Sequence, residues 1–458
     1  MDDNFYNDNI FLTGKTAKKL YAKIKDLPIY DYHSHVPPKE IYEDKVFENI
    51  GQVWLAADHY KWRLMRAAGV SEEYITGTKN YKEKFLKFAS AIETCVGNPV
   101  YHWVHFELKK YFDIHIPLCK KNAEKIWEQA NKIIAQKKLS PKVIINMSNV
   151  AYIGTTDDIA DDLAYHKKIK ADKKFKTTVA PSFRTDNLLL IQKDTYKEYI
   201  TKLSAAAGIE IDSLAALKKA VEKRLDYFAK NGCVFTDVGI SIFPDEIAVE
   251  SQAEQIFKKA LAGKKPTDEE FNKFVGFMYI YLAGLYKSRG MVMQLHIGVM
   301  RNVNSELFKI GPDLGCDVVG SSINAVAFAK LLNAMNERDG LPRTIVYHLN
   351  PTSYYPLSTV AGAFKNVTMG AAWWFNDHAK GMKEHLQMLC ETSNLGTFYG
   401  MLSDSRSFLS YPRHDYFRRV LASFIAKKID AGEYPDNQIA AELLEKICCK
   451  NVKNIIEV

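Results

Sequence analysis

The sequence has too few cysteines, and the wrong spacing, for a disulfide-stabilised fold or a zinc finger. It contains seven cysteines in 458 residues, an odd number, and no two of them form a Cys-x-x-Cys pair. Disulfide frameworks need paired cysteines, and zinc fingers need closely spaced pairs. We therefore expect the cysteines to be reduced and mostly packed in the interior.

Targeting segments and nucleotide motifs are also missing. No stretch approaches the ~18 consecutive apolar residues of a membrane span, and residues 1–5 lack the basic and apolar regions of a signal peptide. No Gly-x-Gly-x-x-Gly follows a strand-like run, and no Gly-x-x-x-x-Gly-Lys-[Ser/Thr] loop occurs. These absences predict a cytoplasmic protein with no membrane partner and no nicotinamide or nucleotide cofactor.

Charge of one sign is not concentrated anywhere in the chain. The 62 Lys and Arg exceed the 54 Asp and Glu by a formal charge of +8. The excess is spread over surface-like helices such as Lys218 to Arg224, without a long basic block, and does not indicate nucleic-acid binding. A solvated basic surface is the commoner reason for it, and a mild attraction of anionic substrates is the alternative.

What the sequence does contain is a series of short apolar runs separated by helical patterns such as Leu214 to Phe228. This alternation is typical of parallel strands joined by crossover helices. Eight such units predict an α/β fold, a (β/α)8 TIM-type barrel, as a single domain over residues 1–458. The runs are one opening at Ile29, then Val150 to Gly154, Thr177 to Phe183, Cys233 to Ile240, Val292 to Val299, Thr344 to Leu349, Val367 to Phe375 and Thr397 to Leu402.

Residues from about 40 to 145 have helical rather than strand periodicity. Apolar positions recur with a helical period in Val53 to Met65, Phe85 to Ile92 and Ile126 to Ile134. The segment is too long for an ordinary connection between barrel strands. We therefore predict a large helical insertion after the first strand, above the mouth of the barrel, where it forms one wall of the site.

The first apolar run ends in His33 and His35, with a single residue between them. In a strand, residues i and i+2 face the same way, so the two imidazoles can reach one target. Pro37 and Pro38 follow and should end the strand, which leaves the pair at its C-terminal mouth. The pattern favours a divalent-metal site over two unrelated histidines only if further ligands converge on it.

Three further polar residues fall near the ends of predicted strands. His296 lies near the end of the fifth run, His348 near the end of the sixth, and Asp404 just past the eighth. A barrel brings the C-terminal ends of its strands to one face, so these residues join His33 and His35 in a candidate metal site. Each alone has a structural explanation, as a hydrogen-bonded core histidine or a helix cap. Their joint placement favours the metal.

Longer motifs surround these residues. They are Asp31 to His35, Asp58 to Arg63, Gly97 to Trp103, Gly154 to Asp158, His296 to Gly298, Trp373 to Asp377 and Asp404 to Tyr411. The last two are long enough to be diagnostic. Together, over nearly the whole chain, they resemble the uronate isomerase family of the amidohydrolase superfamily.

The resemblance implies an intramolecular oxidoreductase that interconverts aldose and ketose forms of hexuronates in carbohydrate catabolism. The substrates it implies are D-glucuronate, giving D-fructuronate, and D-galacturonate, giving D-tagaturonate. It also implies a divalent metal ion, about one per chain with zinc as the expected ion, and a homo-oligomer whose only other partner is the small-molecule substrate.

The chemistry needs a base, an acid and stabilisation of oxyanion charge, because the open-chain aldose loses a proton from C2 and regains one at C1 through a cis-enediol. Asp404 is the candidate base. A metal on the same carboxylate would depress its pKa, so we expect Asp404 to be both ligand and proton carrier. The resemblance places Tyr60 near the substrate oxygens, where a phenol can donate and accept a proton.

The carboxylate of the substrate calls for a planar, bidentate donor, which guanidinium supplies. Arg406 and Arg184 match arginine positions of the family, and Arg406 also belongs to the predicted catalytic set. His59 is expected to add a substrate contact. Trp373 and Trp374 offer an apolar face to the sugar, with packing inside the barrel as the alternative role.

Three positions depart from the usual motifs of the family. Ser34 stands where cysteine is common, Val238 where histidine is common, and His348 where cysteine is common. We expect no Asp or Glu to face the site from the end of the fourth strand. One tightly held ion is therefore predicted, with His296 near it and His348 in a packing or hydrogen-bonding role.

Two other functions remain compatible with parts of the pattern. A metal-dependent amidohydrolase would share the barrel and the metal but would cleave an amide or ester. A non-catalytic sugar-acid binding protein would share the pocket, although the intact set of His33, His35, Asp404, Arg406 and Tyr60 speaks against it.

Overall fold

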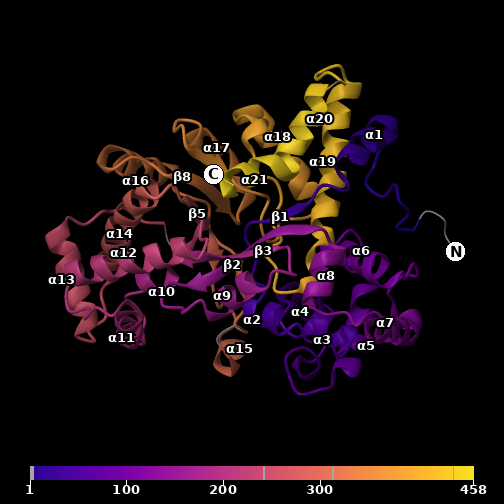
Figure 1. Cartoon of the computed structure of the whole chain (residues 1–458), viewed down its shortest axis with the longest axis horizontal. Coiled ribbons are helices and arrows are strands. Elements are labelled where there is room, and N and C mark those ends of the chain that lie inside the picture. The colour runs from indigo at the N-terminus through magenta and orange to yellow at the C-terminus, as the bar shows by residue number, and fades with distance from the viewer. Residues whose placement is uncertain (1–4, 241–242, 312–313, 437, 458) are drawn as a thin grey trace.

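The computed structural model describes residues 5–240, 243–311, 314–436 and 438–457. At its centre is a curled sheet of seven parallel strands (Figure 1), in the order β1-β2-β3-β4-β5-β8-β9. Neighbours in the sheet follow one another along the chain with helices between them, so the predicted α/β fold class is confirmed. The strands are β1 (Ile29–Asp31), β2 (Val150–Asp158), β3 (Thr178–Arg184), β4 (Thr236–Ile240), β5 (Val292–Ile297), β8 (Arg343–His348) and β9 (Val367–Met369).

The central strands are apolar along their length because both of their faces are covered. Every residue of β5 is buried, as is every residue of β8 after Arg343. In the register of these strands, Gly239 pairs with His296, and Ile297 pairs with His348. The polar residues at the carboxyl ends of β4, β5 and β8 therefore lie along one edge of the sheet.

Helices between consecutive strands, and one helix after the last strand, cover the outside of the sheet (Figure 1). A short excursion made of β6 (Val299–Met300), α15 (Ser305–Ile310) and β7 (Val318–Val319) leaves the end of β5, and β6 pairs with β7 in an antiparallel hairpin. The covering helices are α9 (Ala164–Ala171), α10 (Asp186–Leu189), α11 (Tyr196–Ala207), α12 (Leu214–Lys230), α13 (Glu250–Leu261), α14 (Asp268–Ser288), α16 (Ala325–Arg338), η3 (Pro351–Ser353), α17 (Tyr354–Ala361) and α18 (Ala379–Thr392).

The chain between β1 and β2 is helical. Its first helix begins at Pro38, a position where proline is favoured because the missing N–H has no partner in the helix. These helices form the indigo and violet part of Figure 1, and α4 carries His59 and Tyr60 in its first turn. They are α2 (Pro38–Glu43), α3 (Ile50–Leu55), α4 (His59–Ala67), η1 (Glu72–Tyr74), α5 (Tyr81–Ile92), α6 (Pro99–Phe112), η2 (Lys120–Asn122), α7 (Ala123–Lys137) and α8 (Pro141–Met147).

The prediction of a regular eighth strand at Thr397 to Leu402 was wrong. The segment begins in the 3-10 turn η4 (Leu395–Thr397), and its remaining residues have no regular secondary structure. Gly400 has φ 70° and Asp404 has φ 44°, so the backbone leaves the extended conformation twice. The segment still lies beside β1, because the Asp404 N–H donates to the His33 carbonyl at 3.2 Å and the His35 N–H donates to the Ser405 carbonyl at 2.9 Å.

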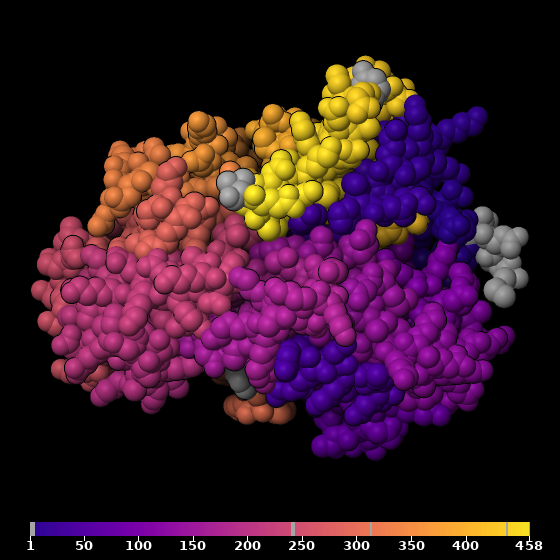
Figure 2. Space-filling model, in the orientation of Figure 1, coloured from indigo at the N-terminus to yellow at the C-terminus, as the bar shows by residue number. Residues whose placement is uncertain are grey.

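The N-terminal and C-terminal helical segments lie side by side, as the indigo and yellow surfaces of Figure 2 show. Helix α1 (Gly14–Ile24) packs against α19 (Pro412–Asp430), and the Thr16 hydroxyl donates to Asp430 at 2.6 Å. The turn η5 (Phe408–Ser410) precedes α19, and α20 (Gln438–Glu445), the π-helical turn η6 (Lys446–Lys450) and α21 (Asn451–Ile456) follow it. All seven cysteines are free thiols. Within the described ranges, no helix has the length and apolar character needed to cross a membrane.

Candidate active site

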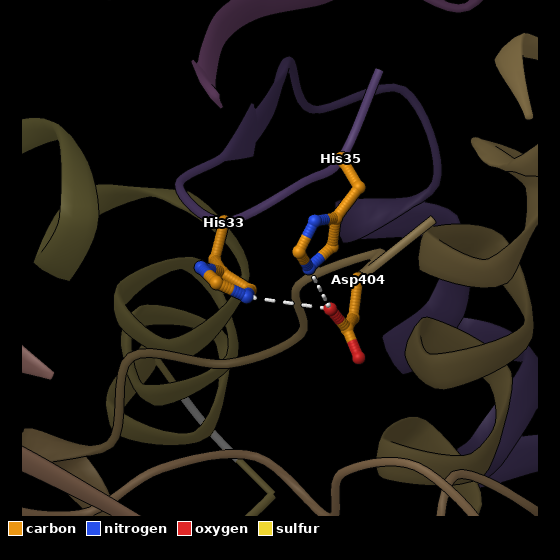
Figure 3. A group of neighbouring side chains, drawn as sticks. All are labelled: His33, His35 and Asp404. Carbon is orange, nitrogen blue, oxygen red and sulfur yellow. Dashed lines mark ion pairs between the residues drawn. The ribbon is translucent and has the colours of Figure 1, made fainter. Parts of the chain in front are cut away.

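The loop after β1 and the segment before α19 bring two histidines and an aspartate together (Figure 3). Nε2 of His33 lies 3.3 Å from Oδ1 of Asp404, and Nε2 of His35 lies 3.1 Å from the same oxygen. The two imidazole rings meet edge to face, with centroids 5.3 Å apart and planes at 85°. Two nitrogens and one carboxylate oxygen therefore converge on one point.

The loop after β1, rather than the strand itself, carries the two histidines, since β1 ends at Asp31. The Ser34 N–H donates to the Gly154 carbonyl at 2.8 Å, which holds this loop against β2. Nδ1 of His35 lies 2.9 Å from the Thr156 hydroxyl, so β2 also orients the ring. Hydrogen bonds to the second ring nitrogen fix which nitrogen faces the site.

Asp404 is held in an unusual backbone conformation and by an unexpected partner. Its φ of 44° is in the left-handed region, which costs free energy for a residue with a side chain. Its Oδ2 accepts a hydrogen bond from Nε1 of Trp373 at 2.6 Å. Burial opposes the negative charge, but hydrogen bonds from His33 and His35 hold the pKa of Asp404 well below its usual range. This hydrogen bond was not predicted from the sequence, from which Trp373 was expected only as an apolar face for the sugar or as a packing residue.

A second cluster shares His33 and adds Asp237 and His296. The candidate ligand atoms lie within 4.8 Å of one another, and Nδ1 of His296 lies 2.8 Å from Oδ1 of Asp237. The expectation that no carboxylate faces the site from β4 was therefore wrong. Asp237 adjoins Val238, and because side chains alternate along a strand the two residues face opposite ways. This alternation was the signal that could have identified Asp237.

The first cluster fits a divalent metal better than the second. Ligand atoms in a tetrahedral site with bonds of about 2.0–2.2 Å lie roughly 3.3–3.5 Å apart, close to the 3.3 and 3.1 Å separations at Asp404. In the second cluster the rings of His33 and His296 are stacked, with centroids 4.5 Å apart and planes at 29°, so their lone pairs run side by side. A cation also occupies that cluster already, because a guanidinium nitrogen of Arg184 lies 2.8 Å from Asp237.

His348 belongs to neither cluster of candidate ligands that the described residues form. Its Nδ1 accepts a hydrogen bond from the Asn350 N–H at 3.0 Å, and burial lowers its pKa to about 4. A neutral histidine that caps its own loop is consistent with the packing role expected for it. His296 lies closer to the site, stacked on Tyr347 with ring centroids 4.3 Å apart.

A cavity of about 870 Å³ opens above the clusters. The predicted substrate residues His59, Tyr60, Arg184, Arg406, Trp373 and Trp374 all line it, together with His33, His35, Asp237, His296 and Asp404. Arg301 and Arg413 also line the cavity, and neither was predicted from the sequence as a site residue. The chain thus places four guanidinium groups around one cavity, which suits an anionic ligand.

The two predicted clamp arginines differ in their surroundings. Arg184 lies 2.6 Å from Asp186 and 2.8 Å from Asp237, so two carboxylates already offset its charge. Burial opposes that charge, yet the two acids raise the pKa of Arg184 above its ordinary value. Arg406 has an exposed side chain at the rim of the cavity.

Comparisons with known proteins extend over the whole chain. The family model for glucuronate isomerase matches residues 1–456. A uronate isomerase of Caldanaerobacter subterraneus subsp. tengcongensis is 43% identical over 463 residues, 99% of each chain. A uronate isomerase of Halalkalibacterium halodurans is 44% identical and covers 98% of this chain and 97% of that protein. The crystal structure of a uronate isomerase from Thermotoga maritima is similar with a TM-score of 0.94 at 35% identity, over 99% of both chains.

Proposed function

This chain belongs to the glucuronate isomerase family, and on that premise we propose that it interconverts D-glucuronate with D-fructuronate and D-galacturonate with D-tagaturonate through a cis-enediol. The enzyme is an intramolecular oxidoreductase of the aldose-ketose isomerase type. The observation that carries the proposal is the convergence of His33, His35 and Asp404 at a cavity lined by four arginines.

His33, His35 and Asp404 would hold one divalent ion per chain, for which zinc is our proposal because two imidazoles and one carboxylate form a set that zinc prefers. When bound, such an ion supplies positive charge that stabilises oxyanion character on a substrate oxygen. His296 and Asp237 would support His33 from the side, since both lie against it rather than against the convergence point. His348 would pack behind them.

We assign proton transfer between the two carbons to Asp404. Its Oδ1 faces both histidines and its Oδ2 faces Trp373, so Oδ1 would be the metal ligand and Oδ2 the proton carrier. The Oδ2 atom would take the proton from C2 while the C–H electrons form the double bond between C1 and C2, and would return the proton to C1. The hydrogen bond from Trp373 holds this oxygen in place during both transfers.

Tyr60 would serve the substrate oxygens. It lines the cavity from the first turn of α4, and burial, reinforced by the Asp377 carboxylate, keeps its pKa well above the ordinary value. Tyr60 therefore starts as a neutral phenol. A phenol can give a proton to O1 and accept one from O2 without a lasting charge.

The substrate carboxylate would bind Arg406, whose exposed side chain lines the cavity. Arg184 would assist as the inner wall of the same pocket. His59 and the rings of Trp373 and Trp374 would contact the sugar hydroxyls and C–H surface.

We further propose that residues 1–458 form one barrel domain with an insertion at about 40–145, since α4 of this segment supplies His59 and Tyr60 to the cavity. A homo-oligomer in the cytoplasm is part of the same proposal. The seven free thiols support a reducing compartment.

Incubation of the purified protein with D-glucuronate and with D-galacturonate, with and without added zinc, tests the function. Ketose should form from at least one uronate, and a chelator should abolish its formation. Release of a carboxylate product from an amide or ester, without ketose, would instead support a metal-dependent amidohydrolase. Binding of uronate without any turnover would support a sugar-acid binding protein.

A further inference from the structure

The hydroxyl of Tyr60 has a partner on the side away from the substrate. Its Oη donates to Oδ2 of Asp377 at 2.7 Å. Tyr60 and Arg413 are among the described residues that line the cavity, whereas Asp377 is not. Asp377 is 4% exposed, so the carboxyl group lies in the protein interior behind the phenol.

The surroundings of Asp377 hold the tyrosine ring firmly, but one oxygen of the carboxyl group has no hydrogen bond from the described residues. The Arg413 guanidinium lies 5.2 Å from the centre of the Tyr60 ring and 3.9 Å from that of Trp103. Trp103 meets Tyr60 edge to face at 5.3 Å. Oδ1 of Asp377 is buried and has no hydrogen-bond partner within the described part of the chain. Among the described side chains, the Tyr60 hydroxyl is thus the hydrogen-bond donor to this carboxyl group, at Oδ2.

The direction of this hydrogen bond decides what Tyr60 can offer to a ligand. When Asp377 is ionised, the phenolic hydrogen points at Asp377 and an oxygen lone pair faces the cavity, so Tyr60 is an acceptor there. When Asp377 is protonated, it can donate to Oη, and the phenolic hydrogen is released toward the cavity. Burial raises the pKa of Asp377 to about 6, although Arg413 and Tyr60 lower it, so both states are accessible near neutral pH.

We propose that Asp377 is a positioning residue that sets the direction of the Tyr60 hydroxyl and takes up its proton when Tyr60 accepts one from the substrate. This inference rests on the proposed isomerase function and deepens it. Asp377 acts only through Tyr60, because the carboxyl group does not reach the cavity.

The protons balance over one turnover. Conversion of an aldose to a ketose moves a proton from C2 to C1 and a second proton from O2 to O1. Oη of Tyr60 gives its proton to O1 as the proton of a protonated Asp377 passes to Oη, so that O1 and O2 of the cis-enediol both carry a proton. The O2 proton then passes to Oη as the phenolic proton returns to Oδ2 of Asp377, and each pair of hops is concerted because the raised pKa of Tyr60 disfavours a free phenolate. Asp377 ends protonated, as it began.

Asp377→Asn separates this role from simple support, since the amide oxygen still accepts the Tyr60 hydrogen bond but the side chain takes up no proton. We expect kcat to fall by at least about tenfold, the lower end for a lost proton-transfer group, with KM within about twofold. In Tyr60→Phe, adding Asp377→Asn should change kcat by less than about twofold. If adding Asp377→Asn to Tyr60→Phe lowered kcat by the same factor as Asp377→Asn alone, the inference would be overturned.

A matched control lies outside the set of residues that line the cavity. Glu222 on α12 accepts a hydrogen bond from the Tyr281 hydroxyl at 2.8 Å, the same kind of pair. Glu222→Gln should leave kcat within about twofold of the unaltered enzyme, and a loss equal to that of Asp377→Asn would overturn the inference, since it would make the effect one of general stability.

A measurement on the unaltered enzyme decides the question if Asp377→Asn does not fold. The plot of kcat against the deuterium fraction of the solvent should be curved, because two exchangeable protons move at Tyr60, and it should become linear in Tyr60→Phe. A linear plot for the unaltered enzyme would refute the relay.

Absence of ketose from every uronate would refute the isomerase function and the relay together. If ketose forms but the effects of Tyr60→Phe and Asp377→Asn on kcat are additive, the relay alone is refuted.

Discussion

Replacing Trp373 by phenylalanine tests whether the indole holds Asp404 for proton transfer. The substitution keeps an aromatic ring against His296, whose centroid lies 4.8 Å from the tryptophan ring, and removes the Nε1–H that donates to Oδ2 of Asp404 at 2.6 Å. A hydrogen bond to a charged group contributes about 1.5–3 kcal/mol. If this energy is used in the transition state, kcat should fall roughly 10- to 150-fold.

The assay compares kcat, KM and metal content of Trp373→Phe with those of the unaltered enzyme on the preferred uronate. We expect KM and metal content to stay close to normal, because Oδ1 of Asp404 keeps its approach to His33 and His35. Trp54→Phe is the matched control, since the Trp54 indole donates to the buried carboxyl group of Glu107 at 2.5 Å, outside the cavity.

The control variant should have a lower Tm and an unchanged kcat. The reasoning about Trp373 would be refuted by a kcat within about twofold of normal in Trp373→Phe, or by an equal loss of kcat in Trp54→Phe. Loss of the metal from Trp373→Phe would also refute it, because the hydrogen bond would then serve binding of the ion rather than proton transfer.

Four further predictions concern single residues. Asp404→Asn should lower kcat by about 100-fold or more, measured as ketose formed from D-glucuronate, because the base is lost; near-normal kcat would remove Asp404 from that role. Arg406→Lys should raise KM at nearly constant kcat, because ammonium lacks the bidentate fork, and an unchanged KM would contradict the clamp. Elemental analysis should find about one divalent ion per chain in the unaltered enzyme and in His348→Ala, and almost none in His33→Ala; about two ions falling to one in His348→Ala would contradict a single site. Burial raises the pKa of Glu107 to about 7, so the folded protein keeps a proton that the unfolded chain has lost between about pH 4.5 and 7, and the unfolding free energy falls as pH rises through this window. Glu107→Gln should therefore raise Tm at about pH 8 more than at about pH 5 in thermal denaturation, and equal shifts at both pH values would contradict the assignment.

Local sequence patterns were sufficient to predict the architecture. Apolar runs with strand composition alternate with helical periodicity, and seven of the eight predicted runs overlap a strand of the central parallel sheet. The eighth run was mistaken because its apolar residues satisfy the pattern while Gly400 and Asp404 take left-handed backbone angles. Side-chain polarity does not report backbone angles, so only the glycine at position 400 signalled this departure.

The sequence by itself also determined which residues gather at the carboxyl edge of the sheet. His33 and His35 are close along the chain, and His296 lies near the end of a predicted strand, so parallel strand order brings these three to one face. Asp404 was expected there for the same reason, and it reaches that face through a segment without regular structure that pairs with the loop after β1. Only the tertiary structure decided how they are used. The imidazole nitrogens of His33 and His35 converge on Asp404, whereas the ring of His296 stacks beside His33.

The contacts that the sequence analysis missed are hydrogen bonds and ion pairs between distant segments. Trp373 and Asp404 are 31 residues apart, Arg184 and Asp237 are 53 apart, and Tyr60 and Asp377 are 317 apart. Periodicity predicts which face of a strand or helix a side chain occupies, but a hydrogen bond depends on distances of a few tenths of an ångström between atoms on different elements. Those distances are set by how the helices after β1 and the loop after β9 pack over the sheet, and this packing is the property of the whole chain.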